Sequence, residues 1–212
     1  MARNPFARLF FAAVRRLLPQ MTSTSLKDLA GRYEDELVGS KFVYTFQEKG
    51  HKPFRVPIEF EPSGFCHLMS VGSMVKDVTP DLDEFSGMKG WRNIQNGKIT
   101  LSLLRKLDPA QFNYYQNEYQ MFDQMIETVR NPQAVRFDVK KVPGSKLKSD
   151  ILLYNIYGNR TIHIGLSQGS DGDWFVRSYF VRENNRDKQY PTKYIANMQP
   201  LSVRVKESSK KA

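Results

Sequence analysis

Acid–base chemistry in this sequence depends on three histidines, at positions 51, 67 and 163. His67 alone follows a turn signal, Pro62-Ser63-Gly64, at the start of an apolar segment, where burial can shift its pKa. RNA can be cut by its own 2′-hydroxyl group, so a protein needs to supply only a proton acceptor, a proton donor and cations near the phosphate. We therefore take His67 as the candidate base or acid; the alternative is a hydrogen-bonded core histidine.

Cations and hydroxyls that could bind a phosphate lie in the last third of the chain. Arg177 and Ser178 are neighbours in a run of β-branched and aromatic residues, so we expect their side chains on opposite faces of a strand. If Ser178 faces the ligand, its hydroxyl can bind a phosphate oxygen while Lys148 supplies positive charge. Arg177 is either a further phosphate ligand or a solvated strand residue. With His67, these three residues make up the candidate catalytic set.

Four further residues are candidates for contact with RNA. Tyr154 and Tyr119 can stack on a base or donate a proton, although a tyrosine in an amphipathic stripe is more often part of the core. His163 alternates with two isoleucines, and we expect it to be exposed on the polar side of its strand. Arg182 adds positive charge to the strand that holds Arg177.

Other kinds of chemistry lack their sequence motifs. The chain has no Gly-rich phosphate-binding loop, and the acidic residues between positions 77 and 84 do not have the spacing of a calcium loop. A single cysteine, Cys66, excludes an intrachain disulfide framework and Cys-rich zinc sites, and the histidines are scattered. We therefore expect neither a metal nor a cofactor, and the cysteine content favours the cytoplasm.

Positive charge is unevenly distributed along the 212 residues, whose formal net charge is +10. Residues 1–20 hold four arginines and no acid, and residues 131–212 hold 15 Lys and Arg against 7 Asp and Glu. A basic field in the last third points to nucleic acid, an anionic membrane surface or an acidic partner protein. The alternative is a basic surface that only keeps the protein soluble.

The elements that must position these residues are read from apolar periodicity and turn signals. We predict helices over 26–37, 65–74, 100–107 and 109–129, and strands over 42–46, 54–60, 135–139, 151–157, 161–166, 174–181 and 200–205. The helices and strands are largely segregated along the chain, which favours an α+β fold. Residues 76–98 lack periodicity and are expected to form a long connection that is a lid, a binding loop or a mobile linker.

Residues 1–20 form a predicted extension in front of the folded domain. Wound as a helix, its apolar residues share one side and two of its arginines share another, which makes a short basic amphipathic helix. Such a helix can lie on an anionic membrane or dock on a partner, or it can do little. No apolar run reaches the roughly 20 residues of a spanning helix. We assign residues 21–207 to one domain and residues 208–212 to a basic tail.

Four segments together resemble a known group of nucleases: Ser25–Ala30, the aromatic hairpin that ends in Phe60, Phe65–Met69 and Arg177–Arg182. From residue 21 to residue 207 the chain is similar to the phage- and mobile-element-associated nucleases of the barnase, EndoU, colicin E5/D and RelE (BECR) fold, and looks PBECR4-like. The resemblance implies a helical N-terminal part packed on an antiparallel sheet of about four or more strands, with active-site groups at the sheet. It also implies a metal-independent ribonuclease that acts as a toxin or in conflicts between hosts and mobile elements.

The chain departs from the family pattern at two positions. The family's Phe-x-His-Leu-x-Gly pattern matches Phe65, His67 and Leu68, but Ser70 stands at the position of the glycine. The family's Ser-Phe pair is Ser178 followed by a tyrosine in this chain. Neither difference removes a proton carrier, but the first affects how the helix that carries His67 is placed.

Three functions are consistent with these observations. The leading hypothesis is a metal-independent endoribonuclease that cleaves RNA by 2′-hydroxyl attack, with an antitoxin or immunity protein as a further partner. The second is a non-catalytic nucleic-acid-binding module that uses the same basic sheet. The third is an accessory protein that docks on a membrane or a partner through residues 1–20.

Overall fold

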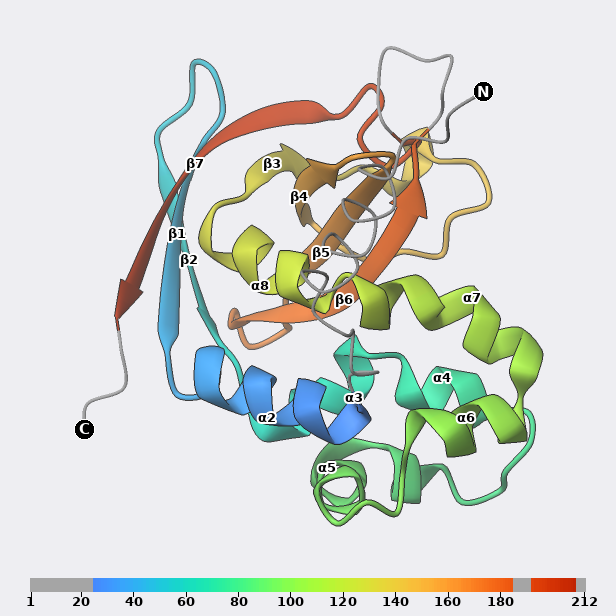
Figure 1. Ribbon diagram of the computed structural model, residues 1–212. Coiled ribbons are helices and arrows are strands. Elements are labelled where there is room, and N and C mark those ends of the chain that lie inside the picture. The colour runs from blue at the N-terminus through green and yellow to red at the C-terminus, as the bar shows by residue number, and fades with distance from the viewer. Residues whose placement is uncertain (1–24, 185–191, 209–212) are drawn as a thin grey trace, which may run out of the picture.

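The protein is an α+β domain in which a curled sheet wraps around a group of helices (Figure 1). The structure is a computed structural model that describes residues 25–184 and 192–208. Seven antiparallel strands form the sheet in the order β2-β1-β7-β3-β4-β5-β6. The strands are β1 (Lys41–Gln47), β2 (Phe54–Glu59), β3 (Gln133–Arg136), β4 (Ile151–Tyr157), β5 (Arg160–Gln168), β6 (Trp174–Glu183) and β7 (Gln199–Ser208). The predicted fold class is confirmed.

Helices cover the inner face of this sheet, and three of them begin at a side-chain cap. The side chain of Ser25 accepts from the backbone of Asp28 in a capping box, and Thr100 and Asp108 cap the helices predicted over 100–107 and 109–129. The helices are α2 (Leu26–Glu36), α3 (Phe65–Leu68), α4 (Val71–Val75), α5 (Gly87–Gln95), α6 (Leu101–Leu107), α7 (Pro109–Gln120) and α8 (Phe122–Arg130). Short 3₁₀ helices are η1 (Pro62–Gly64), η2 (Leu82–Phe85) and η3 (Val139–Lys141).

Two predicted helices are interrupted. The segment 109–129 breaks at Met121 into α7 and α8, although its apolar stripe continues through the break. The segment 65–74 breaks at Ser70 into α3 and α4, because that residue adopts a left-handed backbone conformation. His67 therefore lies on a single short turn of helix and not at the start of a longer one.

Residues 76–98 were wrongly predicted to be a loop, because they contain η2 and α5. The glycines that suggested a loop have a packing role at this place. A Cβ atom on Gly90 would lie 2.7 Å from the backbone carbonyl carbon of Phe85, so α5 can approach η2 only with a glycine there. Trp91 and Ile94 of α5 are buried in the main core.

Strand β7 is central in the sheet, whereas the prediction placed a short edge strand at 200–205. It pairs with β1 on one side and with β3 on the other. It also continues to Ser208, so that most of the predicted tail 208–212, like the predicted helix in residues 1–20, lies outside the described residues. Pro57 does lie on an edge strand, as expected for a residue that cannot donate to the ladder.

Both faces of the β4–β6 meander are covered over most of its length. Its inner face packs on α7 and α8 as part of the main core. Its other face carries a second, smaller core of six buried residues: Val135, Phe137, Val142, Leu152, Ile195 and Met198. We expected this face to be open, polar and basic. That prediction was wrong, because the segments 137–147 and 192–198 fold over it.

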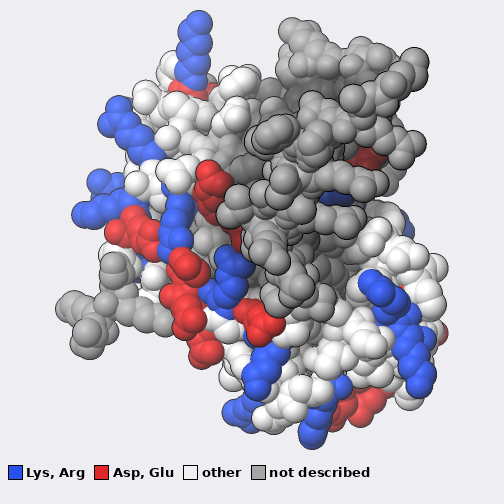
Figure 2. Space-filling model, viewed as in Figure 1, with Lys and Arg blue, Asp and Glu red and all other residues white. Residues whose placement is uncertain are grey.

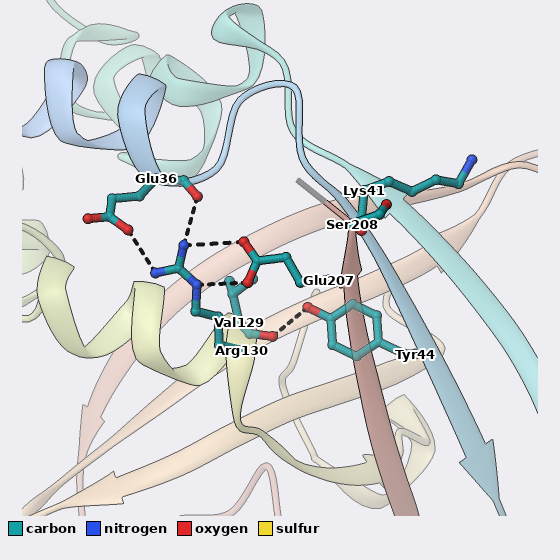
Figure 3. A network of polar contacts seen from close by, with 7 residues as sticks. All are labelled: Glu36, Lys41, Tyr44, Val129, Arg130, Glu207 and Ser208. Carbon is teal, nitrogen blue, oxygen red and sulfur yellow. Dashed lines mark hydrogen bonds and ion pairs between the residues drawn. The ribbon is translucent and has the colours of Figure 1, made fainter. Parts of the chain in front are cut away.

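Arg130 joins the helices to the first three strands of the sheet (Figure 3). Its guanidinium binds a carboxylate oxygen of Glu36 in α2 at 2.8 Å and one of Glu207 in β7 at 3.1 Å. Beside it, the hydroxyl of Tyr44 in β1 donates to the backbone oxygen of Val129 in α8 at 2.8 Å. Two carboxylates on one guanidinium form a network, which holds its geometry better than an isolated surface ion pair.

The left-handed backbone of Ser70 should lower the stability of the protein. Ser70 has a φ of 55°, in the left-handed region that costs a non-glycine residue roughly 1 kcal/mol or more. We expect Ser70→Gly to raise the free energy of unfolding by about 1 kcal/mol, measured by urea denaturation. Ser70→Ala is the control and should bring no such gain. Equal or lower stability of the glycine variant would show that the break lies elsewhere.

Candidate active site

A β-bulge in β6 lies at the centre of the candidate site. The pairing register between β5 and β6 shifts between Gly165 and Leu166, which leaves Arg177 as an extra residue in β6. Arg177 Nε donates to Ser167 Oγ at 2.9 Å, and a Cβ atom on Gly165 would lie 2.4 Å from Ser178 Oγ. Two residues apart on one strand share a face. Arg177 and Ser178 therefore project from the same face, and the predicted opposite faces were wrong because of the bulge.

His67 is hydrogen-bonded to the backbone of this bulge. Its Nε2 lies 2.6 Å from the backbone oxygen of Arg177. A carbonyl oxygen only accepts, so Nε2 carries the hydrogen and, in the neutral imidazole, Nδ1 carries the free lone pair. Nδ1 has no hydrogen-bond partner within residues 25–184 and 192–208. The side chain is exposed and not buried as expected, so a ligand can reach it.

Two clefts meet at His67, which is the residue common to their described linings. The sheet cleft has a volume of about 530 Å³ and lies where the edge strands β2 and β6 approach each other. It is lined by Tyr33, Lys41, Pro57, Glu59, Phe60, Glu61, Ser63, Gly64, His67, Leu68, Asp173, Trp174, Phe175 and Val176. The helix cleft has a volume of about 390 Å³. It is lined by Cys66, His67, Ser70, Gly72, Ser73, Lys76, Leu82, Phe85, Ser86 and Gly87.

The two clefts differ in charge. Three carboxylates line the sheet cleft against one lysine, Lys41, whose Nζ lies 3.0 Å from Glu59 Oε1. The other two carboxylates belong to Glu61 and Asp173. The described lining of the helix cleft includes Lys76 and three serines and no carboxylate. The helix cleft therefore favours an anion, while the sheet cleft offers hydrogen-bond acceptors and aromatic rings.

The guanidinium of Arg177 is fixed at its Nε end and free at the other. The hydroxyl of Ser167 that accepts from Nε donates in turn to the backbone oxygen of Lys148 at 2.7 Å. Cζ of Arg177 lies 4.8 Å from the ring centroid of Phe175, which lines the sheet cleft. The terminal nitrogens of Arg177 have no partner among the described residues, so they can bind an anion. Lys148 is exposed close to this contact.

Ser178 does not reach either cleft in this structure. Its Oγ is buried, has no partner in the described part of the chain, and packs with Ser149 Oγ over Gly165. A Cβ atom on Gly165 would lie 2.2 Å from Ser149 Oγ, so only glycine fits between the two hydroxyls. The predicted contact between Ser178 and a phosphate is therefore wrong for this geometry. Ser178 packs behind the bulge at Arg177.

Tyr119 and His163 are buried and cannot contact RNA in this structure. The hydroxyl of Tyr119 donates to the backbone oxygen of Met69 at 2.8 Å and so links α7 to the turn after α3. His163 is 0% exposed, stacks on Phe180 with ring centroids 4.5 Å apart, and places Nε2 2.9 Å from Thr192 Oγ1. Desolvation lowers the pKa of His163 to about 3, so the imidazole is neutral. Its predicted exposure was wrong, because the second core covers that face.

Tyr154 and Arg182 are half-buried, at a distance from the bulge. Tyr154 pairs with His163 in the meander and packs against the second core, and this burial raises its pKa. Nη1 of Arg182 lies 3.5 Å from Glu118 Oε1, and Nη2 donates to the hydroxyl of Tyr114 at 2.9 Å. Arg182 is thus already paired, although part of its side chain stays accessible.

Glu118, which pairs with Arg182, is a buried carboxyl of helix α7 that faces the edge strand β6. It is 0% exposed, its Oε1 accepts from the backbone nitrogen of Val181 at 3.3 Å, and its Oε2 has no partner in the described part of the chain. Desolvation raises its pKa to about 7, against the opposing effect of the Arg182 guanidinium. The carboxyl therefore changes charge near neutral pH.

This titration should be visible in the stability of the protein. Because the pKa is raised in the folded state, the stabilisation is fully present below the unfolded pKa and is lost as pH rises through about 7. Relative to Glu118→Gln, the wild type should lose about 3 kcal/mol of unfolding free energy between pH 4 and pH 8. Urea denaturation at a series of pH values measures this difference. Parallel curves for the two proteins would contradict the burial of an ionisable carboxyl here.

The described part of the chain offers no metal site, membrane-spanning helix or reactive thiol. Residues 25–184 and 192–208 contain no cluster of three or more His, Cys, Asp or Glu side chains that could hold a metal ion. None of the helices in that part is both long and apolar enough to cross a membrane. Cys66 is buried, and burial raises the pKa of its thiol to about 12, so it is not poised as a nucleophile.

Sequence reasoning missed most of the residues that shape the clefts. Asp173 is the last residue of the predicted turn between the last two meander strands, and Trp174 begins the predicted strand that follows; such turns often carry binding residues. The turn was therefore a local signal that could have identified Asp173 and Trp174. Glu61 and Lys76 flank His67 in the sequence, but their places in the clefts depend on η1 and on the helix break at Ser70, which the predicted single helix over 65–74 did not include.

Comparison with protein-family models supplies an independent assignment. Residues 25–210 match the family described as phage-Barnase-EndoU-ColicinE5/D-RelE like nuclease4 (PBECR4). No curated protein and no solved structure matches the chain. The matched region includes the seven strands, the bulge at Arg177 and His67. Because the match spans nearly the whole sequence, the chain belongs to the PBECR4 family of phage BECR-like nucleases.

Proposed function

We propose that this nuclease is a metal-independent endoribonuclease in which His67 transfers a proton during attack of a 2′-hydroxyl on the adjacent phosphate. One observation carries the proposal. The imidazole of His67 is exposed at the junction of two clefts, with Nε2 fixed to the bulge by a 2.6 Å hydrogen bond and Nδ1 free. A ring held in one orientation and one tautomer is prepared for proton transfer at Nδ1.

Cations on neighbouring elements suit the phosphate in this scheme. Arg177 has free terminal nitrogens beside the bulge, and Lys76 lines the helix cleft together with His67. Lys148 adds charge on the Arg177 side. Preorganised cations of this kind stabilise the charge that develops on the phosphate oxygens.

The sheet cleft supplies a second proton carrier. In the proposed reaction the 2′-oxygen bonds to phosphorus, the bond from phosphorus to the 5′-oxygen breaks, and the products end in a 2′,3′-cyclic phosphate and a 5′-hydroxyl. One group must take the 2′-hydroxyl proton while another gives a proton to the 5′-oxygen. Glu61 and Asp173 line the same cleft as His67, so a carboxylate and an imidazole can share these two roles.

Removal of the His67 imidazole is the direct test. We expect His67→Ala to lower kcat for RNA cleavage in EDTA by about 10²- to 10⁴-fold, the usual contribution of a general acid or base. His51→Ala is the matched control, because His51 is exposed in the β1–β2 turn away from both clefts, and it should cleave like wild type. Unchanged cleavage by His67→Ala would disprove the role of His67, and loss of wild-type activity in EDTA would disprove metal independence.

Substitution of the substrate tests the chemistry itself. An RNA with a single 2′-deoxy nucleotide at the cleaved position should resist cleavage there, and the unmodified RNA should yield a 2′,3′-cyclic phosphate end. Cleavage at the deoxy position would exclude attack by the 2′-hydroxyl. RNA that is bound in a salt-dependent manner but never cut would favour the non-catalytic binding module. The roles as a toxin, an immunity partner and a cytoplasmic location stay predictions.

A further inference from the structure

The outer face of β1, β2 and β7 carries a basic groove. Thr45 of β1 is paired with Arg55 on one side and Arg204 on the other, and Val43 in the next row is paired with Lys206. Directly paired residues in an antiparallel sheet share a face. The intervening residues of β1 are 0–1% exposed in the main core, so this face points away from the helices. The groove has a volume of about 340 Å³.

The three cations of the groove have no counter-charge among the residues that the structure describes. Arg55, Arg204 and Lys206 are exposed and take part in none of the ion pairs or side-chain hydrogen bonds formed within the described residues. The described lining of the groove contains no carboxylate. In Figure 2, Lys and Arg side chains project from the left margin, the side on which β1, β2 and β7 lie in Figure 1, with acidic side chains beside them. Arg55 and Arg204 lie on either side of β1, and Lys206 is two residues along from Arg204, so these like charges repel unless an anion lies between them.

The groove begins where the sheet cleft ends. Pro57 lines the sheet cleft and is the strand partner of Val43, which lines the groove. Lys41 lines the sheet cleft and is the partner of Ser208, which also lines the groove. From the row of Lys41 to the row of Thr45 the strand advances four residues, or about 14 Å. An extended polymer that leaves the sheet cleft can thus continue over the cations.

We propose that this groove binds the phosphate backbone of single-stranded RNA on one side of the scissile bond. The proposal rests on the proposed function and adds an extended substrate to it. A protein partner fits less well, because protein interfaces centre on exposed apolar or aromatic anchors. None of the described large hydrophobic residues that are exposed lines the groove. Cations alternate here with the hydroxyls of Thr45 and Ser208, which suit phosphate and sugar oxygens.

A charge-removal variant tests the groove. The groove variant combines Arg55→Gln, Arg204→Gln and Lys206→Gln. The control variant combines Arg92→Gln, Lys98→Gln and Lys106→Gln. It removes the same amount of positive charge from exposed positions on and around α5 and α6. Both are compared with wild type for cleavage of a 12-nucleotide single-stranded RNA and of a dinucleotide. For the 12-mer, the groove variant should raise KM by about 10- to 100-fold with kcat unchanged, and it should cleave the dinucleotide like wild type. The control variant should match wild type on both.

Binding measured in the His67→Ala background separates this proposal from the proposed function. By fluorescence anisotropy, the groove substitutions should weaken 12-mer binding and lower the slope of log K against log salt by about 2, from three lost contacts to a single strand. That result supports the groove even if the protein cuts no RNA. Equal affinity and slope in the groove and control variants would overturn the proposal. So would a groove variant that loses only the binding of poly-glutamate, which would assign the face to an acidic protein.

Discussion

The β-bulge at Arg177 is the point where the helical part of the protein and the sheet are joined at the candidate site. Because β6 is an edge strand, the backbone oxygen of Arg177 is available to a group outside the sheet, and His67 Nε2 binds it at 2.6 Å. The same extra residue puts the Arg177 and Ser178 side chains on one face. A regular strand would send one of them to the opposite face, and Arg177 Nε could not then reach Ser167. The bulge thus determines both the tautomer of His67 and the orientation of the Arg177 guanidinium.

The bulge in turn depends on the space above Gly165. Two hydroxyls, of Ser149 and Ser178, occupy the volume that any larger side chain would need. Ser149 comes from the segment that leads into β4, directly after Lys148, whose backbone oxygen accepts from Ser167. Small residues on three neighbouring segments therefore let the strands approach each other closely. At this separation the hydroxyl of Ser167 connects the backbone oxygen of Lys148 to the guanidinium of Arg177. The close packing around Gly165 therefore also fixes the position of the positively charged Arg177 guanidinium beside the sheet cleft.

Local patterns predicted the parts of this arrangement that are encoded within a few residues. The starts of the helices at Leu26 and Pro109 and the three meander strands followed from turn and periodicity signals, and they are present in the structure. The surroundings of His163 could not be predicted in this way, because Thr192 and Tyr194, which contact its ring, come from a segment distant in the sequence. The bulge was also hidden. It shifts the core-facing positions of β6 from Trp174 and Val176 to Tyr179 and Val181, but the apolar residues Phe175 and Phe180 on the other face mask that shift in the sequence. Pairing of Lys41 with Ser208, which makes β7 a central strand, is likewise a long-range property.

Charged residues that are close in the sequence also end up far apart in the folded protein. The excess of cations after residue 131 suggested a basic face on the meander, but in the structure these cations lie on different surfaces. Arg182 is paired with the buried Glu118. Arg204 lies on the outer face of the sheet, across β1 from Arg55, which comes from the first half of the chain. In the sheet cleft, Lys41 is engaged with one of the three carboxylates, which leaves net negative charge there. A phosphate is disfavoured in such a cleft and a hydroxyl is favoured. Cations outside the cleft and acceptors inside it would thus fix the direction in which an RNA strand presents its 2′-hydroxyl to His67.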